Sequence, residues 1–121
     1  MLYTTYFANL RNLPENITPI AICSKSPEGY KGLEYKKLAP KWSFFSVWRE
    51  TGDNQYYVEH FDKEVLAGLN PNKVYYELVS LAGGNTEIAL VCYETPEKFC
   101  HRHLVRNWFM IHGFPIKEFG C

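Results

Sequence analysis

The stretch that decides the fold runs from residue 87 to residue 112 and reads EIALVCYETPEKFCHRHLVRNWFMIH. Its first part, residues 87–93, is almost continuously apolar, which is typical of a strand buried on both faces of a parallel sheet. Its last part repeats apolar residues at helical spacing up to residue 112, and Gly113 then favours a helix end. A strand that ends in polar groups and turns into a helix is where open α/β sheets bind ligands. We therefore expect the sheet and the functional site to be organised around this stretch.

Strand and helix patterns alternate along the rest of the chain. The predicted strands are residues 2–8, 17–23, 87–93 and 114–119. The predicted helices are residues 40–50, 54–67 and 71–82, and a last helix that begins between residues 96 and 101 and ends at residue 112. Asn70-Pro71 and Thr95-Pro96 are good pairs for starting a helix. The sequence thus predicts an α/β fold: a three-layer, Rossmann-like single domain over residues 1–121, with a small, mostly parallel sheet of about four strands flanked by about four helices.

Residues 24–40 are the longest segment without a regular pattern, and they directly follow the second predicted strand. A loop of this length inside a compact domain is usually functional or disordered. We expect Lys25 and Tyr30 in this loop to close over a bound ligand. Asn9 follows the first predicted strand and offers a carboxamide for recognising a base or a ribose in the same cleft.

The composition argues against several classes of binding partner and cellular location. The chain carries 13 basic and 13 acidic side chains, and this zero net charge argues against a broad positive surface for duplex nucleic acid, although it is compatible with one basic pocket. No run approaches the ~20 apolar residues of a membrane span, and the N-terminus lacks the pattern of a secretory signal. Four cysteines without such a signal favour reduced thiols in the cytoplasm. Aromatic residues make up 17% of the chain, and a homo-oligomer would be one way of burying part of that surface.

The segment LVCYETPEKFCHRHL, residues 90–104, combines an apolar strand, Cys-x-Glu, a short loop with a proline, and Cys-His-Arg. In this combination it resembles the C-terminal hallmark of a bacterial and phage family, the domain of unknown function 488 family. Residues 3–9 resemble the first strand of that family, and residues 20–27 its second strand and the loop that follows. The resemblance implies an α/β fold and a site at this segment, and it implies no particular reaction.

The chain departs from the family pattern at two places. Phe7-Ala8-Asn9 stands where many members have a Gly-His-Ser type of turn. Cys23-Ser24-Lys25 stands where many members have Asp-x-Arg. An activity that depends on those absent groups is therefore not implied for this chain.

Arg102 is the first candidate for ligand binding. A helix N-terminus offers unpaired backbone N–H groups and partial positive charge, and a guanidinium matches phosphate or carboxylate with two parallel hydrogen bonds. These properties predict an anion pocket with Arg102 at its centre and Cys92 in its floor. The alternative is that Arg102 pairs with Glu94 or Glu97 and only fixes the loop.

Cys100 is the candidate nucleophile. A thiolate near a helix N-terminus, His101 and Arg102 would have a lowered pKa, which nucleophilic catalysis requires. His101 or Glu94 would then act as its base. The alternative is a buried structural role, because free cysteine is among the most buried residue types.

A metal site is the third interpretation. Cys92, Cys100, His101 and Cys23 could supply four soft or borderline ligands at the strand ends. Against this, adjacent residues such as Cys100 and His101 on one helix point about 100° apart, and the chain has no Cys-x-x-Cys pair. We therefore predict no metal and no other cofactor.

Together these interpretations predict that the chain binds a small anionic or nucleotide-like molecule at the C-terminal strand edge, and they leave open whether it also processes that molecule. Two alternatives stay open. One is a cysteine-dependent enzyme with Cys100 as nucleophile, and the other is a non-catalytic protein that sequesters a ligand or a partner.

Overall fold

The structure is a computed structural model, and it describes residues 1–120. It contains a five-stranded sheet in which every strand pair is parallel. The strand order is β3-β2-β4-β1-β5. The strands are β1 Leu2–Tyr6, β2 Thr18–Ala21, β3 Leu33–Glu34, β4 Ile88–Cys92 and β5 Ile116–Glu118. The predicted α/β class and parallel sheet are confirmed, and the sheet has one strand more than we expected.

The central strand β4 owes its place to its apolar sequence. All five of its residues are buried, and it pairs with β1 on one side and with β2 on the other. Ile88 and Leu90 join the main core. Because both neighbours run parallel to β4, the C-terminal ends of β1, β2 and β4 lie along one edge of the sheet.

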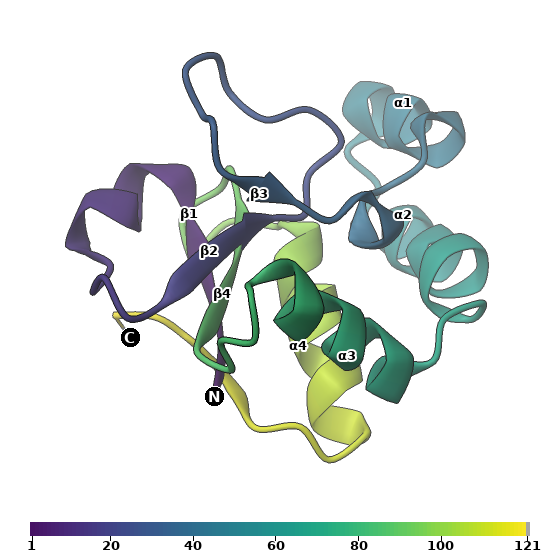
Figure 1. Cartoon of the computed structure of the whole chain (residues 1–121). Helices are drawn as coiled ribbons and strands as arrows, with labels where there is room; N and C mark the ends of the chain where they lie inside the picture. Colours follow the sequence, from purple (N-terminus) through teal and green to yellow (C-terminus); the bar gives the residue numbers. More distant parts are fainter. Residues whose placement is uncertain (121) are drawn as a thin grey trace.

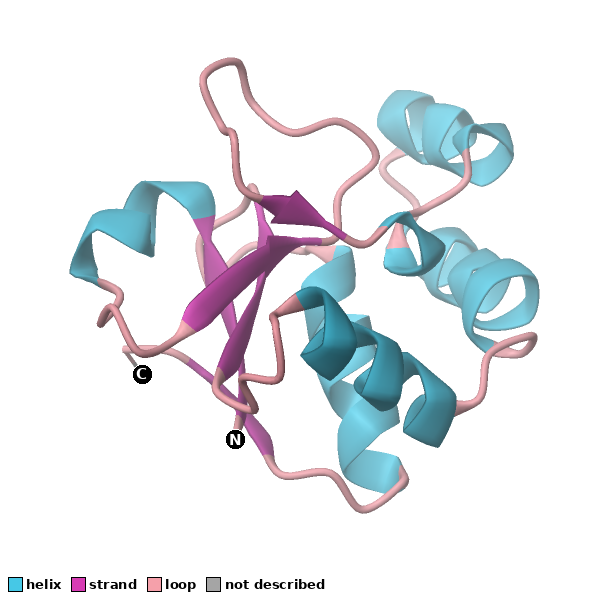
Figure 2. Cartoon of the chain, in the orientation of Figure 1, coloured by secondary structure: helices cyan, strands magenta, loops and turns pink. Residues whose placement is uncertain are grey.

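The α-helices gather on one side of the sheet (Figures 1 and 2), and the short 3-10 segment η1, Phe7–Asn12, lies on the other side. The helices are α1 Trp42–Thr51, α2 Asn54–Phe61, α3 Pro71–Leu81 and α4 His101–Ile111. A π-helical turn, Asp62–Leu66, continues α2. The three layers are therefore unequal, with a thick helical layer on one face and a thin cover on the other. In the part of the chain that the structure describes, no helix has the length and apolar character needed to cross a membrane.

Two predicted helix starts have different outcomes. Helix α3 begins as predicted, because the Asn70 side chain accepts hydrogen bonds from the backbone N–H groups of Asn72 and Lys73 and Pro71 follows it. Helix α1 begins at Trp42 rather than at residue 40, because Lys41 still has an extended backbone.

The first strand and the long loop are also corrected in detail. Strand β1 ends at Tyr6 rather than at residue 8, and η1 occupies part of the predicted polar connection. The predicted loop at residues 24–40 contains strand β3 and a 3-10 turn, Lys36–Leu38. A two-residue strand at a sheet edge has too little periodic pattern to be recognised from sequence.

Candidate functional site

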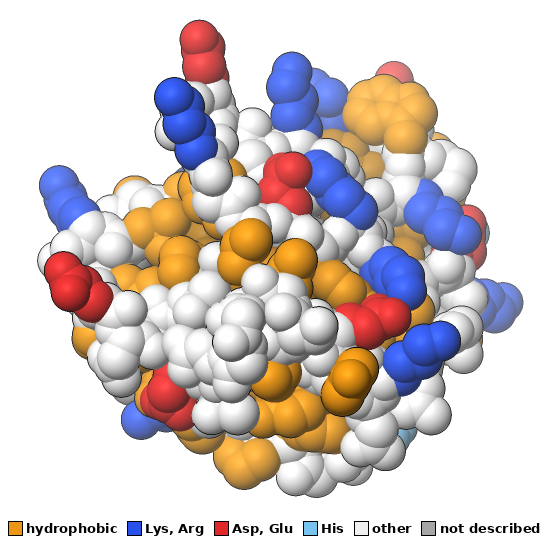
Figure 3. Space-filling model, in the orientation of Figure 1, with side chains coloured by type: hydrophobic (Ala, Val, Ile, Leu, Met, Phe, Trp, Pro, Cys, Tyr) orange, Lys and Arg blue, Asp and Glu red, His pale blue; other side chains and the backbone are white. Residues whose placement is uncertain are grey.

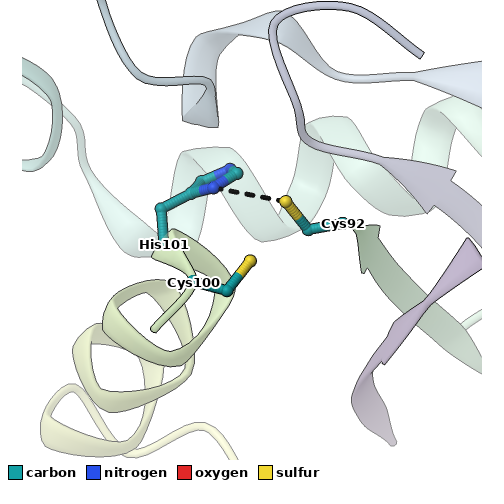
Figure 4. Close-up of side chains that lie close together, drawn as sticks. All are labelled: Cys92, Cys100 and His101. Atoms are coloured by element: carbon teal, nitrogen blue, oxygen red, sulfur yellow. Dashed lines mark hydrogen bonds between the residues drawn. The ribbon is translucent and has the colours of Figure 1, made fainter. Parts of the chain in front are cut away.

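Three reactive side chains meet where β4 ends and α4 begins. Cys92 is the last residue of β4, Cys100 caps the N-terminus of α4, and His101 is the first residue of α4. Each is only 5% exposed. Cys92 Sγ lies 3.4 Å from His101 Nδ1, and the two sulfurs and a ring nitrogen of His101 all lie within 4.8 Å of one another. Figure 4 shows the three side chains pointing into one shared space.

The backbone of Cys100 explains how two adjacent residues can converge. Its φ of −153° and ψ of 142° are extended, so Cys100 stands outside the helix that His101 begins. Helix α4 therefore begins at His101, within the predicted range of residues 96–101, and does not use Thr95-Pro96 as its start. The assumption that Cys100 and His101 share a helix and point about 100° apart is wrong for the same reason.

The imidazole of His101 is fixed by a backbone carbonyl. Its Nε2 lies 2.7 Å from the carbonyl oxygen of Ile22. A carbonyl oxygen can only accept, so Nε2 must carry a hydrogen. In the neutral ring this leaves Nδ1 with a free lone pair, and Nδ1 is the atom that faces Cys92.

The two thiols have different acidities. The pKa of Cys100 is lowered to about 3, chiefly through hydrogen bonding from the Cys92 thiol, with smaller contributions from His101 and the Arg102 backbone N–H. The pKa of Cys92 is raised, first by its hydrogen bond to Cys100 and then by burial. Two thiolates this close would repel each other, and the position at the helix N-terminus favours negative charge on Cys100. Cys100 is therefore the more acidic thiol of the pair.

The three side chains lie on the wall of a cleft between α1 and the ends of β2 and β4. The larger of two adjoining cavities has a volume of about 580 Å³, and the smaller one has about 150 Å³. Phe45, Cys92, Tyr93 and His101 line both of them. Cys100 lines only the smaller one.

Two basic side chains form part of the wall of the larger cavity. Lys25 and Arg49 line it, and the Arg49 guanidinium lies 5.9 Å above the ring of Trp42. Residues 24–49 carry six basic side chains and only two acidic ones, although the chain as a whole is neutral. Lys and Arg side chains stand out along the upper and right-hand part of the face shown in Figure 3.

Arg102 lies outside both cavities and is fully buried. Its Nε and Nη2 donate to Glu118 Oε1 and Oε2 at 3.1 and 3.0 Å, and its Nη1 donates to the Glu94 carbonyl. Thr4 Oγ1 also donates to Glu118 Oε1, at 2.6 Å. All three guanidinium nitrogens are therefore used inside the protein. The expectation that Arg102 lies open at the centre of an anion pocket is not met. The alternative ion pair with Glu94 or Glu97 is not formed either, because Arg102 pairs with Glu118 and contacts the loop only through the Glu94 carbonyl.

The family follows from a comparison with known family models. The model DUF488-N3a, described as the active DUF488-N3 subclade, matches residues 5–113. The chain belongs to this family. The resemblance of residues 90–104 is thereby confirmed. No curated protein and no solved structure gives a significant match to the chain.

In this DUF488-N3a protein the other predicted site residues fall into two groups. Lys25 lines the larger cavity, and Glu94 is exposed and lines the smaller one. Asn9 and Tyr30 line neither cavity. The Asn9 carboxamide donates to Thr5 Oγ1 at 3.3 Å, and the Tyr30 hydroxyl donates to the Leu33 carbonyl at 2.7 Å. The Asn9 contact is local to β1 and η1, whereas the Tyr30 ring packs against the cluster that contains Cys23, Cys92 and Cys100.

Several cleft residues of this DUF488-N3a chain were missed as site residues. Trp42, Phe45 and Arg49 are three and four residues apart on α1, which is the spacing of one helix face. An arginine within an aromatic face was the signal that could have pointed to a ligand rather than to core packing. Glu118 gave no such signal, because its partner Arg102 lies 16 residues away in the sequence.

Proposed function

We propose that the protein binds a small, planar, anionic molecule of the nucleotide-like class in the cleft, and that Cys100 reacts with it as a nucleophile. The observation that carries the proposal is the position of the Cys92, Cys100 and His101 cluster on the wall of the cleft. The family description as an active subclade also favours catalysis over simple sequestration. A reduced, cytoplasmic location suits an enzyme that depends on free thiols, and the three cysteines that the structure describes are all free.

The cleft supports the proposed class of ligand by its place, size and lining. It lies at the C-terminal edge of a parallel sheet, where such folds bind ligands. A cavity of about 580 Å³ falls within the range of roughly 300–1,000 Å³ that is usual for small-molecule sites. Trp42, Phe45 and Tyr93 offer stacking surfaces for a planar ring, and Lys25 and Arg49 offer positive charge.

The proposed step uses the cluster as a thiol and imidazole pair. The Cys100 sulfur forms a bond to an electrophilic carbon of the ligand, and the bond from that carbon to a leaving group breaks with its electron pair. The proton that Cys100 gives up on ionising is held at His101 Nδ1, and it passes from there to the leaving group. The hydrogen bond from Nε2 to the Ile22 carbonyl holds the ring in the tautomer that this transfer needs.

Calorimetric titration with nucleoside monophosphates tests the ligand class. We expect binding that weakens in Arg49→Gln and Lys25→Gln, because each substitution removes a cation from the cavity wall. Arg11→Gln is the matched control, since Arg11 is exposed on η1 and lines neither cavity. Binding that is absent, or equally strong in all variants, would contradict the proposed ligand class.

Alkylation tests the nucleophile separately. Iodoacetamide at neutral pH should label Cys100 faster than Cys92 or Cys23, as read by mass spectrometry of peptides. Slow and equal labelling of the three would overturn the role of Cys100. A ligand recovered unchanged after incubation and denaturation would show sequestration instead of catalysis.

A further inference from the structure

We propose that Cys92, Cys100 and His101 bind one thiophilic divalent metal ion of the Zn²⁺ type, with a fourth coordination position open toward the cleft. The inference goes beyond the thiol chemistry proposed above, because in the metal-bound protein both sulfurs become ligands. It requires only the three side chains and their surroundings, and it holds whichever molecule the cleft binds.

The spacing of the three ligand atoms suits a tetrahedral ion. With Zn–S near 2.3 Å and Zn–N near 2.05 Å, tetrahedral angles place a sulfur and a nitrogen roughly 3.6 Å apart, and two sulfurs roughly 3.8 Å apart. Cys92 Sγ and His101 Nδ1 are 3.4 Å apart, and all three atoms lie within 4.8 Å of one another. Shifts of a few tenths of an ångström to about an ångström would bring the three atoms to these separations.

The orientation of His101 is the one that metal-binding imidazoles adopt. Such rings commonly donate their other N–H to a carboxylate or a backbone carbonyl, which fixes the tautomer and points the free nitrogen at the ion. Here Nε2 donates to the Ile22 carbonyl at 2.7 Å, and Nδ1 faces the sulfurs. This hydrogen bond is an observation independent of the spacing.

The charge balance also favours a divalent ion. Two thiolates, a neutral imidazole and a 2+ ion sum to zero, so the loaded site can stay buried at little electrostatic cost. Two sulfurs and one imidazole select Zn²⁺ and similar ions over Mg²⁺ or Ca²⁺, which prefer oxygen ligands.

The fourth position is left for water or for a ligand in the cleft. Among residues 1–120, the group of side chains close enough to share an ion contains only these three members. Structural zinc sites use four protein ligands, whereas three protein ligands and an open position are typical of catalytic zinc sites. Cys92 and His101 also line the cavities, so the open side of the cluster faces the cleft.

Cobalt provides a visible probe for the site. Titrating the reduced protein with Co²⁺ should saturate at one equivalent, with a sulfur-to-cobalt charge-transfer band and the intense visible bands of a tetrahedral ion. One equivalent of Zn²⁺ should then abolish both signals. Saturation without a charge-transfer band would place the ion elsewhere and overturn the proposal.

Variants assign the ligands. Cys92→Ser, Cys100→Ser and His101→Gln should each lose Co²⁺ affinity by more than the roughly 10–100-fold that follows removal of a residue that only orients a ligand. Cys23→Ser is the matched control, because Cys23 is a buried cysteine in the larger cavity but outside the three-residue group. Circular dichroism checks that each variant is folded. An affinity that is unchanged in any of the three ligand variants would overturn the site as proposed.

A measurement on the unmutated protein avoids any folding defect. One equivalent of Zn²⁺ should slow iodoacetamide labelling of both Cys92 and Cys100 and leave Cys23 unaffected. Labelling of Cys92 and Cys100 that is unchanged by Zn²⁺ would overturn the metal site. Rapid labelling of Cys100 in the metal-free protein would still support the proposed nucleophile, so the two proposals can fail separately.

Discussion

Two buried polar clusters include neighbouring residues of α4, His101 and Arg102, but they differ in how completely their polar groups are paired inside the protein. The first is the group of Cys92, Cys100 and His101, and the second is the group of Arg102, Glu118 and Thr4. In the second group every guanidinium nitrogen has a partner, and both carboxylate oxygens of Glu118 accept hydrogen bonds. In the first group the two sulfurs border open cavities.

This difference in hydrogen bonding indicates that Arg102 has a structural role, whereas Cys100 and His101 of the same motif are available for chemistry. A buried charge whose partners are all supplied by the protein has no bonding capacity left for a ligand, and removing one partner is costly. A buried thiol beside a cavity is only partly satisfied, so it can react or coordinate at little cost to the fold. The motif Cys-His-Arg therefore places reactive groups at residues 100 and 101 and anchors them through residue 102.

The largest effect is expected from breaking the structural cluster. Arg102→Met leaves the buried Glu118 carboxylate without its ion pair and should lower the free energy of unfolding by about 3–5 kcal/mol. Urea denaturation followed by circular dichroism measures this loss. Arg106→Met is the matched control one turn later on α4, where the structure shows no ion pair among residues 1–120, and it should cost less than about 1 kcal/mol.

A second substitution keeps this test informative if Arg102→Met does not fold. Replacing both partners, as in Arg102→Met with Glu118→Leu, removes the uncompensated charge and should recover much of the lost stability. If Arg102→Met were stable but had lost ligand binding, the predicted role of Arg102 in an anion pocket would be supported instead of a structural role.

A smaller effect on stability is expected in the reactive cluster. Cys92→Ala removes a sulfur that borders both cavities, so no enclosed void is created. The loss of buried apolar surface should cost about 1 kcal/mol, measured by the same urea titration. A cost as large as that of Arg102→Met would show that the thiols hold the fold together, and the contrast between the clusters would be lost.

Much of the fold could be predicted because its strands and helices follow from short-range patterns in the sequence. The apolar run of β4, the Asn70-Pro71 start of α3 and the alternation of strands with helices are all short-range signals. Strand β3 was missed because its two residues owe their conformation to pairing with Ile20 and Ala21 of β2. That pairing joins residues more than ten positions apart in the chain.

The sequence indicated which segment holds the reactive side chains, but it did not indicate which of them face a cavity. The sequence prediction placed the reactive side chains in residues 91–104, and the structure brings Cys92, Cys100 and His101 of that segment together. Which of them would face a cavity depended on the backbone of Cys100 and on the distant Glu118. No periodic pattern encodes either of these, so Arg102 was assigned to the ligand and Trp42 and Arg49 were not.

The smallest effect concerns a half-buried carboxylate that contrasts with fully buried Glu118. Glu77 Oε1 accepts hydrogen bonds from the Tyr35 hydroxyl at 2.5 Å and from Lys37 Nζ at 3.1 Å. The pKa of Glu77 is lowered, first by the bond from Tyr35 and then by Lys37. Its contribution to stability is therefore present above the pKa of an unfolded glutamate and is lost as the pH falls through the lowered value.

Glu77→Gln should flatten this acid part of the stability profile, as measured by urea titrations across pH. Salt should weaken the contribution of Glu77 in the unmutated protein, because the ion pair with Lys37 is accessible to solvent. An unchanged profile would mean that the Glu77 carboxylate adds nothing to stability, and the cost of removing an ion pair in this protein would be confined to the buried cluster.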